Sequence, residues 1–576
     1  MKFAITCICA CFLLFSCGDG GKKSEQKLTP AKGNKYYGGI FKMNEVEYFR
    51  SLFPLNVTEV TGHRITNQIY EGLVRFDQAD LSIVPVLAES WEVDSTASKF
   101  VFHLRKGVKF HDDACFPNGK GKEVTANDFK YSLTKLCEYS ATNEGYKFFS
   151  DKIAGCEAYY VSTRNGQPLP EGVAGVKVID DYTLEISLNR PVGNFLDFLA
   201  LPFAAVFPKE AVDKYGIDMR EKAVGTGPFY IKSLKHDQSV YLARNESYWG
   251  KDADGNQLPY LEGIKVSFIK ERKSELLEFK KGNLDMIYRL PLELTTEIVT
   301  KDDKLQDAYK QYVLQVAPSL SVWYLGFLNT DPVFSNKNLR IAFNYAIDRK
   351  KICEYTLKGA GFPAIHGIVP MGMEGYDAEV VKGYDYDPVK AREYLAKAGY
   401  PNGKGLPAIT LGINSGGGTN EQLAEALSKM LEETLNIKVN ITSVPFPQHT
   451  ENVETSKVPF FRMGWNADYP DPETFLCLFY GKNVPSNPSE RSYLNSSRYK
   501  NAAYDALYEA AISTADDDKR NLLYIKAEQL MMDDAPVMPI YYYKDHRLLQ
   551  PYVLNFPQNA MEYRLLREVY FKPQTN

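Results

Sequence analysis

The chain has 576 residues, of which 44% are hydrophobic and 24% are charged, a composition typical of globular proteins and not of disordered or fibrous chains. This length predicts two or more domains, because one domain usually has about 100–200 residues. The formal net charge is −4 and the sequence has no basic stripe, which argues against nucleic acid as a partner.

The N-terminus has the features of an export signal. Lys2 precedes an uncharged, mostly apolar stretch, residues 3–15, that is too short to span a bilayer as a helix. Leu-Phe-Ser-Cys at 14–17 resembles a bacterial lipobox, so we expect a signal peptide over residues 1–16 and lipidation of Cys17. An uncleaved anchor and ordinary secretion are the alternatives.

Residues 17–34 are rich in Gly, Lys and Ser, and they are predicted to form a flexible lipoprotein tether. The protein is therefore expected to be an exported cell-envelope lipoprotein, on the periplasmic side or at the cell surface. Its contact with the membrane would be through the lipid anchor only.

The predicted mature chain keeps five cysteines besides Cys17. An odd number leaves at least one of them unpaired within the chain. Cys137 and Cys156 are close enough in sequence to pair, but buried free thiols explain them equally well. The other three are Cys115, Cys353 and Cys477.

The first half of the chain predicts short strands and helices. Residues 66–76 have the pattern of an amphipathic helix interrupted by Gly72. A second helix is predicted to begin at Thr125 and to bury Phe129, Leu133 and Leu136. Strands are expected at 100–104, 175–179, 183–188 and 264–269, the middle two as a hairpin.

The second half has a strand, a helix and a strand at 410–413, 420–435 and 438–442. This order predicts an α/β layer. Further helices are expected at 338–357, 387–398 and 519–532, and a further strand at 538–543.

Motifs of catalysis and metal binding are missing from the sequence. It has no HExxH, no GxSxG and no GxxxxGK[ST] pattern. Residues 252–256 begin like a calcium loop, but Gln257 and Gly263 stand where its glycine and final glutamate belong, so a polar turn is the better interpretation. We therefore expect neither an enzyme nor a bound metal or cofactor.

Ten segments occur in an order that resembles a known family. They are QIYEGLVRFD (68–77), VPVLAESW (84–91), FHLRKGVKFHD (102–112), VTANDF (124–129), VGTGPFY (224–230), RNESYW (244–249), LRIAFNYAIDR (339–349), YDPVKA (386–391), WNADYPDP (465–472) and DAPVMPIY (534–541). Together they resemble the extracellular solute-binding proteins of ABC importers, of the oligopeptide/dipeptide type (family 5).

The resemblance implies an α/β, two-lobed periplasmic-binding-protein-like (type II) fold with an extra accessory subdomain in the first lobe. Two chain crossings, near Phe268 and Ile540, would act as hinges for opening and closing. The implied divisions are lobe I at 35–64, 175–268 and 536–576, the accessory subdomain at 65–174, and lobe II at 269–535.

The resemblance also implies where a peptide would bind as an extended strand between the lobes. Asp468 would take the free α-amino group of the peptide, and Arg462 matches a position that can bind its carboxylate. Gly464 and Asn466 would offer backbone groups, and Trp465 belongs to the same motif.

Two more residues are candidates for this site. Val60 would lie on a facing strand of the first lobe, and Tyr541 lies at the second crossing. Other roles are open for several candidates. Asp468 is also suited to cap the turn that follows it, Arg462 to be a surface charge, and Tyr541 to be a core residue.

The predicted function is that of a monomeric, lipid-anchored binding protein. It would capture peptides and deliver them to the permease and ATPase subunits of an ABC importer. An oligosaccharide or a metal complex such as haem is the alternative ligand. A secreted hydrolase, and a signalling or chaperone lipoprotein, are the alternatives outside this class.

Overall fold

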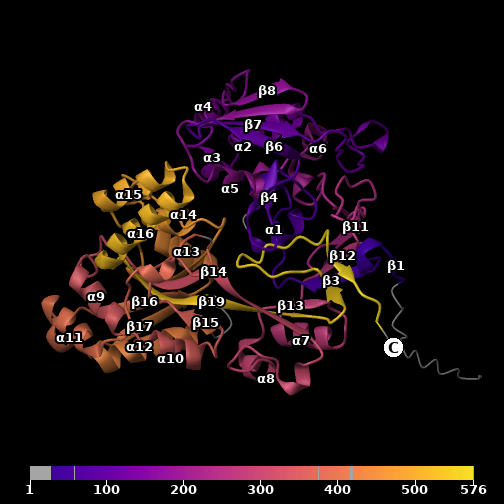
Figure 1. Ribbon diagram of the computed structural model, residues 1–576. Coiled ribbons are helices and arrows are strands. Elements are labelled where there is room, and N and C mark those ends of the chain that lie inside the picture. The colour runs from indigo at the N-terminus through magenta and orange to yellow at the C-terminus, as the bar shows by residue number, and fades with distance from the viewer. Residues whose placement is uncertain (1–26, 58, 374, 416–418, 575–576) are drawn as a thin grey trace, which may run out of the picture.

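The computed structural model describes residues 27–57, 59–373, 375–415 and 419–574 (Figure 1). The expected signal peptide, Cys17 and the first part of the expected tether lie outside the described residues. Among the helices within these ranges, none is long and apolar enough to cross a membrane.

Lobe I is built on a four-stranded sheet whose parts come from distant segments of the chain. Its order is β10 (Phe229–Lys235), β11 (Ser239–Arg244), β12 (Gly263–Ser267) and β3 (Ile40–Asn44). β12 and β3 pair in parallel. The buried ring of Phe41 in β3 lies 5.6 Å from that of Phe556 and 6.2 Å from that of Phe571, so the C-terminal segment completes this core.

The accessory subdomain has its own antiparallel sheet. Its order is β6 (Ala88–Val93), β7 (Lys99–Leu104), β9 (Thr183–Ser187) and β8 (Val176–Asp180). The predicted hairpin is confirmed as β8 and β9. Both strands belong to this sheet although they follow the boundary expected after residue 174.

Helix α2 (Ala126–Leu136) confirms the predicted helix start. Thr125 and Asp128 form a capping box, which satisfies free backbone donors of the first turn. A disulfide joins Cys137, at the end of α2, to Cys156, the first residue of α4 (Cys156–Arg164). The sequence left open whether Cys137 and Cys156 pair, and in the structure they do. The other three described cysteines are free thiols.

Lobe II contains a seven-stranded sheet with helices on both faces (Figure 1). Its main path is β13 (Met286–Tyr288), β19 (Val537–Leu549), β14 (Val313–Phe327), β18 (Phe460–Asn466), β16 (Ile409–Asn414) and β17 (Val439–Val444), and β15 (Gly361–Pro363) pairs with β19. The predicted strand–helix–strand unit is confirmed as β16, α12 (Thr419–Leu435) and β17. Buried residues of α12, α9 (Lys337–Tyr345) and α11 (Pro388–Lys397) form a core against the sheet.

Two long antiparallel strands, β14 and β19, cross from one lobe toward the other (Figure 1). Their pairing is interrupted between Pro318 and Val322 of β14. In this gap Leu320 donates its N–H to the carbonyl of Ala560 and accepts the N–H of Ala467, each at 2.8 Å. Leu320 therefore ties the C-terminal segment of lobe I to the end of β18 in lobe II.

Two predicted helices differ from the structure. Residues 66–76 are not a helix, because α1 (Val60–Thr66) ends at Thr66 and β4 (Val74–Phe76) follows. The carbonyls of Gln68 and Ile69 accept hydrogen bonds from lobe I instead, at 3.0 and 2.8 Å, so tertiary pairing replaces helical pairing.

The predicted helix over 338–357 is divided. α9 ends at Tyr345, and Asp348 caps the short α10 (Arg349–Lys351). The buried Arg349 donates to the carbonyls of Asn344 and Pro539, at 3.0 and 2.6 Å. These bonds fix the break between the two helices.

Candidate ligand-binding site between the lobes

Residues 193–199, which follow the sheet of the accessory subdomain, touch the helical part of lobe II. The N–H of Gly193 donates to the carbonyl of Ile512, the last residue of α15 (Ala502–Ile512), at 3.3 Å. The ring of Phe198, in α5 (Phe195–Leu199), lies 4.8 Å from that of Tyr469. Buried residues of both parts form one hydrophobic core, so the lobes are closed on each other.

Strand β18 has a free edge near this contact. It pairs with β16 only at Phe461, and no other described strand covers that side beyond this residue. The hydrogen bond from Ala467 to Leu320 makes them a hydrogen-bonded pair. Because such pairs alternate along antiparallel strands, Gly464 and Asn466 direct their N–H and C=O groups away from β14. An edge of this kind accepts an additional extended chain.

Gly464 is required by the ring beside it. A Cβ atom at this position would lie 2.3 Å from Cε3 of Trp323, which is too close for any side chain. The guanidinium of Arg462 lies 4.1 Å from the centre of the same indole. Trp323 was not a candidate from the sequence. The signal that could have pointed to it is an aromatic residue in a strand that pairs with the motif strand, opposite Gly464.

Arg462 and Tyr541 are both buried, with 5% and 3% of their surfaces exposed, so Arg462 is not a surface charge. Nη1 of Arg462 donates to Oδ1 of Asn414 at 2.8 Å, and its Nε has no hydrogen-bond partner among the described residues. The ring of Tyr541 lies 6.2 Å from that of Trp323. These three residues form one stack on a single face of the sheet.

Asp468 follows the end of β18 and is half-buried. Burial raises the pKa of its carboxyl group to about 7, and the nearby Glu473 adds to this shift. Within the described part of the chain its carboxylate has no ion-pair partner. Asp471, and not Asp468, caps the following turn, because its Oδ1 accepts the N–H of Glu473 at 2.8 Å.

Trp465 lies on the opposite face of β18 from Arg462. Its indole Nε1 approaches the hydroxyl of Thr474 at 3.4 Å, and the N–H of Asp468 donates to the same hydroxyl at 3.3 Å. The ring of Tyr493 lies 6.5 Å away. Thr474 thus positions Asp468, a role with no sequence signal.

Val60 corrects one prediction. It is the first residue of helix α1 and is 51% exposed, so the expected facing strand does not form at this residue. Its N-terminal neighbour Glu59 has extended backbone angles and directly precedes the helix. Contact of Val60 with a ligand stays a prediction, as do the ligand contacts of the β18 residues and Tyr541.

The described residues contain no group of three or more His, Cys, Asp or Glu side chains placed to hold a metal ion. The calcium-like sequence forms a polar turn, in which Asp252 accepts the Lys35 ammonium at 2.6 Å and the Asn256 amide at 2.9 Å. Because the Lys35 ammonium already neutralises the charge of Asp252, this turn does not resemble a calcium site.

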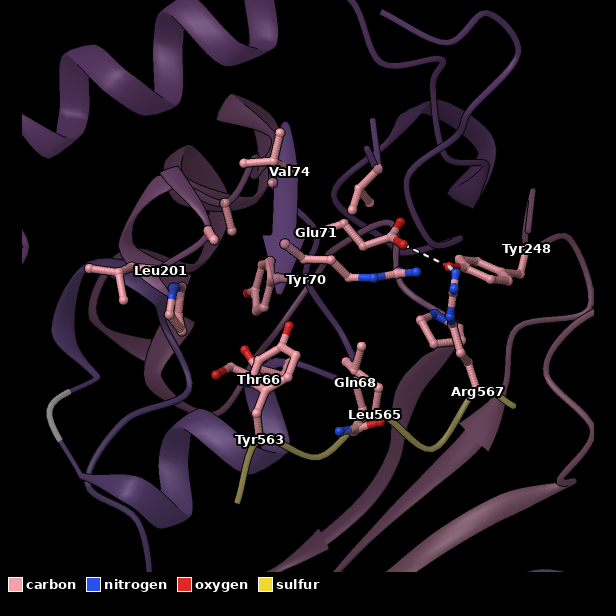
Figure 2. Close-up of a pocket in the computed structure, with 18 residues that line it drawn as sticks. Thr66, Gln68, Tyr70, Glu71, Val74, Leu201, Tyr248, Tyr563, Leu565 and Arg567 are labelled. Atoms are coloured by element: carbon pink, nitrogen blue, oxygen red, sulfur yellow. Dashed lines mark hydrogen bonds between the residues drawn. The ribbon is translucent and has the colours of Figure 1, made fainter. Parts of the chain in front are cut away.

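A small cavity lies where the accessory segment meets lobe I, and several of the family-like segments line it (Figure 2). Its volume is about 30 Å³, room for about two water molecules. Glu71, at its wall, accepts the hydroxyls of Tyr248 and Thr226 and the indole N–H of Trp249, at 2.7, 2.9 and 3.0 Å. Three of the recurring segments therefore meet at one buried carboxylate that supports the fold.

Two lobes, two long connecting strands and a free strand edge at their junction define a solute-binding protein of the two-lobed periplasmic type. The sequence model for bacterial extracellular solute-binding proteins, family 5, matches residues 82–487. The chain belongs to this family, which confirms the resemblance and the fold expected from the sequence.

Relatives of known function cover nearly the whole chain. The periplasmic oligopeptide-binding protein OppA of Escherichia coli is 28% identical over 88% of this chain and 87% of its own. Heme-binding protein A of Haemophilus influenzae is 26% identical over 98% of each chain. The solved structure of DppA from Helicobacter pylori, in complex with the peptide STSA, has a TM-score of 0.75 and 25% identity, covering 93% of this chain and 98% of that one. All three are named as binding proteins, not as enzymes.

Proposed function

We propose that this protein captures peptides between its lobes and passes them to an ABC importer. The observation that carries the proposal is the position of Asp468 directly after a free strand edge. An extended peptide paired with Gly464 and Asn466 would bring its N-terminal ammonium group toward this carboxylate.

Electrostatics supports the same arrangement. Burial has raised the pKa of Asp468 to about 7, which means that its charged form lacks a partner in the protein. A ligand ammonium supplies that partner and favours the charged carboxylate. Backbone pairing reads no side chains, so a range of peptide sequences would be accepted.

The test compares Asp468→Asn with the parent protein by calorimetry, using a tripeptide and its N-acetylated form. Loss of a charged hydrogen bond costs about 1.5–3 kcal/mol, so we expect about 10- to 100-fold weaker binding of the free-amine peptide by the variant. Asp385→Asn is the matched control, because Asp385 forms a surface pair with Lys350 in the same lobe. Equal binding of the acetylated peptide by the parent would contradict the proposal.

The ligand class has a direct test of its own. One relative is named for peptides and another for haem at similar identity, so family membership alone does not choose between them. Mass spectrometry of material that co-purifies with the protein should detect peptides. Haem, an oligosaccharide or another metal complex in their place would refute peptide capture.

Export and anchoring complete the proposal. We infer that the protein is released from its signal peptide before Cys17 and carries lipid on that residue, and that it works as a monomer with the permease and ATPase subunits. The lipobox-like sequence at 14–17 supports the anchor. Mass spectrometry of the mature N-terminus should find acylated Cys17, and a Cys17→Ser variant should leave the membrane fraction. An unmodified mature N-terminus would contradict this part.

A further inference from the structure

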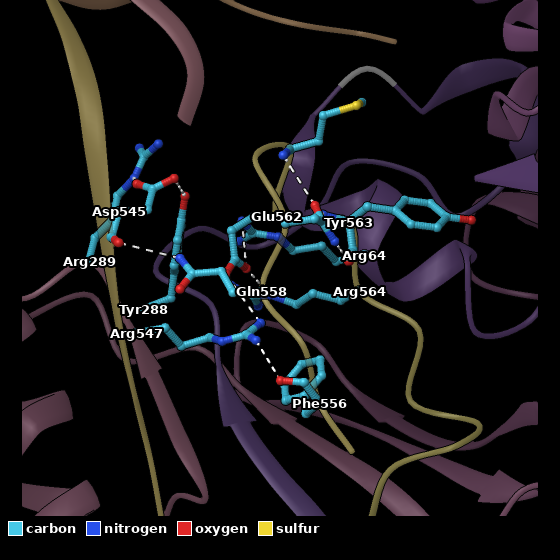
Figure 3. A network of polar contacts seen from close by, with 12 residues as sticks. Arg64, Tyr288, Arg289, Asp545, Arg547, Phe556, Gln558, Glu562, Tyr563 and Arg564 are labelled. Carbon is cyan, nitrogen blue, oxygen red and sulfur yellow. Dashed lines mark hydrogen bonds and ion pairs between the residues drawn. The ribbon is translucent and has the colours of Figure 1, made fainter. Parts of the chain in front are cut away.

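A cluster of buried charges lies where β13, β19 and the C-terminal segment meet (Figure 3). Glu45 pairs with Arg64 at 2.9 Å and with Arg564 at 2.7 Å. Glu562 pairs with Arg564 at 2.6 Å and with Arg547 at 3.3 Å. Each of these five side chains is at most 10% exposed.

Arg289 extends this cluster toward solvent. It follows the last residue of β13, and its Nε donates to Oδ1 of Asp545 at 3.2 Å. Tyr288 donates its hydroxyl to the other oxygen of Asp545 at 2.7 Å. The side chain of Arg289 is 32% exposed whereas that of Asp545 is 2% exposed, so the carboxylate is covered and the guanidinium is not.

The cluster carries more positive than negative charge. Four guanidinium groups meet three carboxylates, which leaves one positive charge in excess. The guanidiniums belong to Arg64, Arg289, Arg547 and Arg564, and the carboxylates to Glu45, Asp545 and Glu562. The adjoining Arg272 pairs with Glu275 at 2.9 Å and does not change the balance.

Two donors of the same cluster are unused. Nε of Arg64 and Nη2 of Arg564 are buried and lack a hydrogen-bond partner in the part of the chain that the structure describes. Buried positive charge without a counter-charge is costly in free energy. Arg289, which is paired with Asp545, is the most exposed cation of the cluster.

The backbone of Arg289 is held in an uncommon conformation. Its φ is 61°, in the left-handed region that non-glycine residues seldom occupy, and such strain is often found at binding sites. Its guanidinium lies 4.5 Å from the ring centre of Tyr543 and 5.1 Å from that of Tyr288. Figure 3 shows the guanidinium pointing away from Glu562.

Arg289 also adjoins the candidate site. The rings of Tyr543 and Tyr541 lie 6.1 Å apart on β19, and Tyr541 belongs to the stack that contains Arg462. Thus Arg289 and Arg462 flank one row of aromatic rings. Of the two, Arg462 is buried, whereas the two terminal nitrogens of Arg289 are available for a forked contact.

We propose that Arg289 binds a carboxylate of the captured ligand. This contact makes the protein selective for peptides whose carboxylate reaches Arg289 when their ammonium group lies at Asp468. The carboxylate belongs either to the C-terminus of a short peptide or to an acidic side chain. This inference rests on the proposed function, because it deepens the choice of ligand at the same site.

The experiment uses four peptides with free N-termini, namely Ala-Ala-Ala as acid and as amide, and Ala-Glu-Ala and Ala-Gln-Ala as amides. Calorimetry gives their affinities for the parent, Arg289→Gln and Arg289→Lys. The parent should prefer one carboxylate-bearing peptide over its neutral partner by about 10- to 100-fold. Arg289→Gln should lose this preference while binding the neutral peptide within about twofold of the parent. Arg289→Lys should keep part of it, because the charge remains and the fork is lost.

The two arms identify the carboxylate, since the acid–amide pair reports the C-terminus and the Glu–Gln pair reports a side chain. Arg244→Gln is the matched control, because Arg244 is partly exposed, pairs with Glu246 at 2.9 Å and lies on lobe I strand β11. Circular dichroism and thermal unfolding verify that each variant is folded.

Several results would overturn the inference. They are an unchanged preference in Arg289→Gln, an equal loss of affinity for acidic and neutral peptides, and a preference that disappears in Arg462→Gln but not in Arg289→Gln. If the parent binds no free-amine peptide at all, the proposed function fails and this inference fails with it. If Asp468→Asn weakens peptide binding but Arg289→Gln keeps the preference for the carboxylate-bearing peptide, the proposed function stands and this inference alone fails.

Discussion

Replacing Glu562 with Gln should destabilise lobe I by about 3 kcal/mol, and the structure gives the magnitude in two ways. Burial alone would raise the pKa of Glu562, yet Arg564, Arg547 and Arg64 hold it at about 2, against an ordinary value of 4.5. A difference of about 2.5 units at about 1.36 kcal/mol per unit is about 3 kcal/mol. Independently, removing one member of a buried ion pair costs about 3–5 kcal/mol.

The same shift predicts how stability depends on pH. The folded-state pKa of Glu562 lies below its unfolded value, so its contribution is complete above pH 4.5 and is lost as the pH falls toward about 2. Burial also lowers the pKa of Arg547, to about 10, which leaves it charged throughout this range. Glu562→Gln should therefore remove part of the acid sensitivity of the parent.

Urea unfolding, followed by circular dichroism at neutral pH and at about pH 3, measures both effects. Glu568→Gln is the control, because Glu568 is 42% exposed in its pair with Arg567 and exposed pairs contribute about 0–1 kcal/mol. A Glu562→Gln variant whose free energy of unfolding stays within about 0.5 kcal/mol of the parent would refute the reasoning.

Three further predictions concern the site and the disulfide. Because burial holds the pKa of Asp468 at about 7 without ligand, affinity for free-amine peptides should rise about 20-fold from about pH 5.5 to about pH 7.5, whereas Asp468→Asn should give a flat profile by calorimetry. Gly464→Ala should lower stability by about 1–3 kcal/mol in thermal unfolding and weaken peptide binding, because the new Cβ would lie 2.3 Å from Trp323; an unchanged melting temperature would contradict this. Replacing Cys137 and Cys156 with Ser should cost about 2–4 kcal/mol, and peptide mapping without reductant should recover the linked pair from the parent.

The fold could be predicted from the sequence where its signals are local. Helix α11 was predicted because Asp387, Pro388 and Gly399 mark its ends, and Asp387 does cap it. Strand β14 was missed because its 15 residues pass through two environments. Its first six residues are exposed or half-buried and its last part is buried, so no single period runs through it.

The site was only partly within reach of the sequence. Asp468 and Arg462 came from the resemblance, and the structure explains why each has an unusual environment. Arg289 carries no signal of its own, because its ion-pair partner Asp545 and the ring of Tyr543 lie more than 200 residues away along the chain. Such long-range meetings follow from topology, and local patterns do not encode them.

The order of strands in lobe I has a consequence for biosynthesis. β3 near the start of the chain pairs with β12, and the ring of Phe41 is covered by Phe556 and Phe571. A growing chain cannot seal its first lobe until its last residues are made, although domains usually mature in N- to C-terminal order during translation. Ribosome-bound intermediates of this protein should therefore keep an unfinished N-terminal half until termination, and deletions of even the final 20 or so residues should be far more harmful than their position suggests.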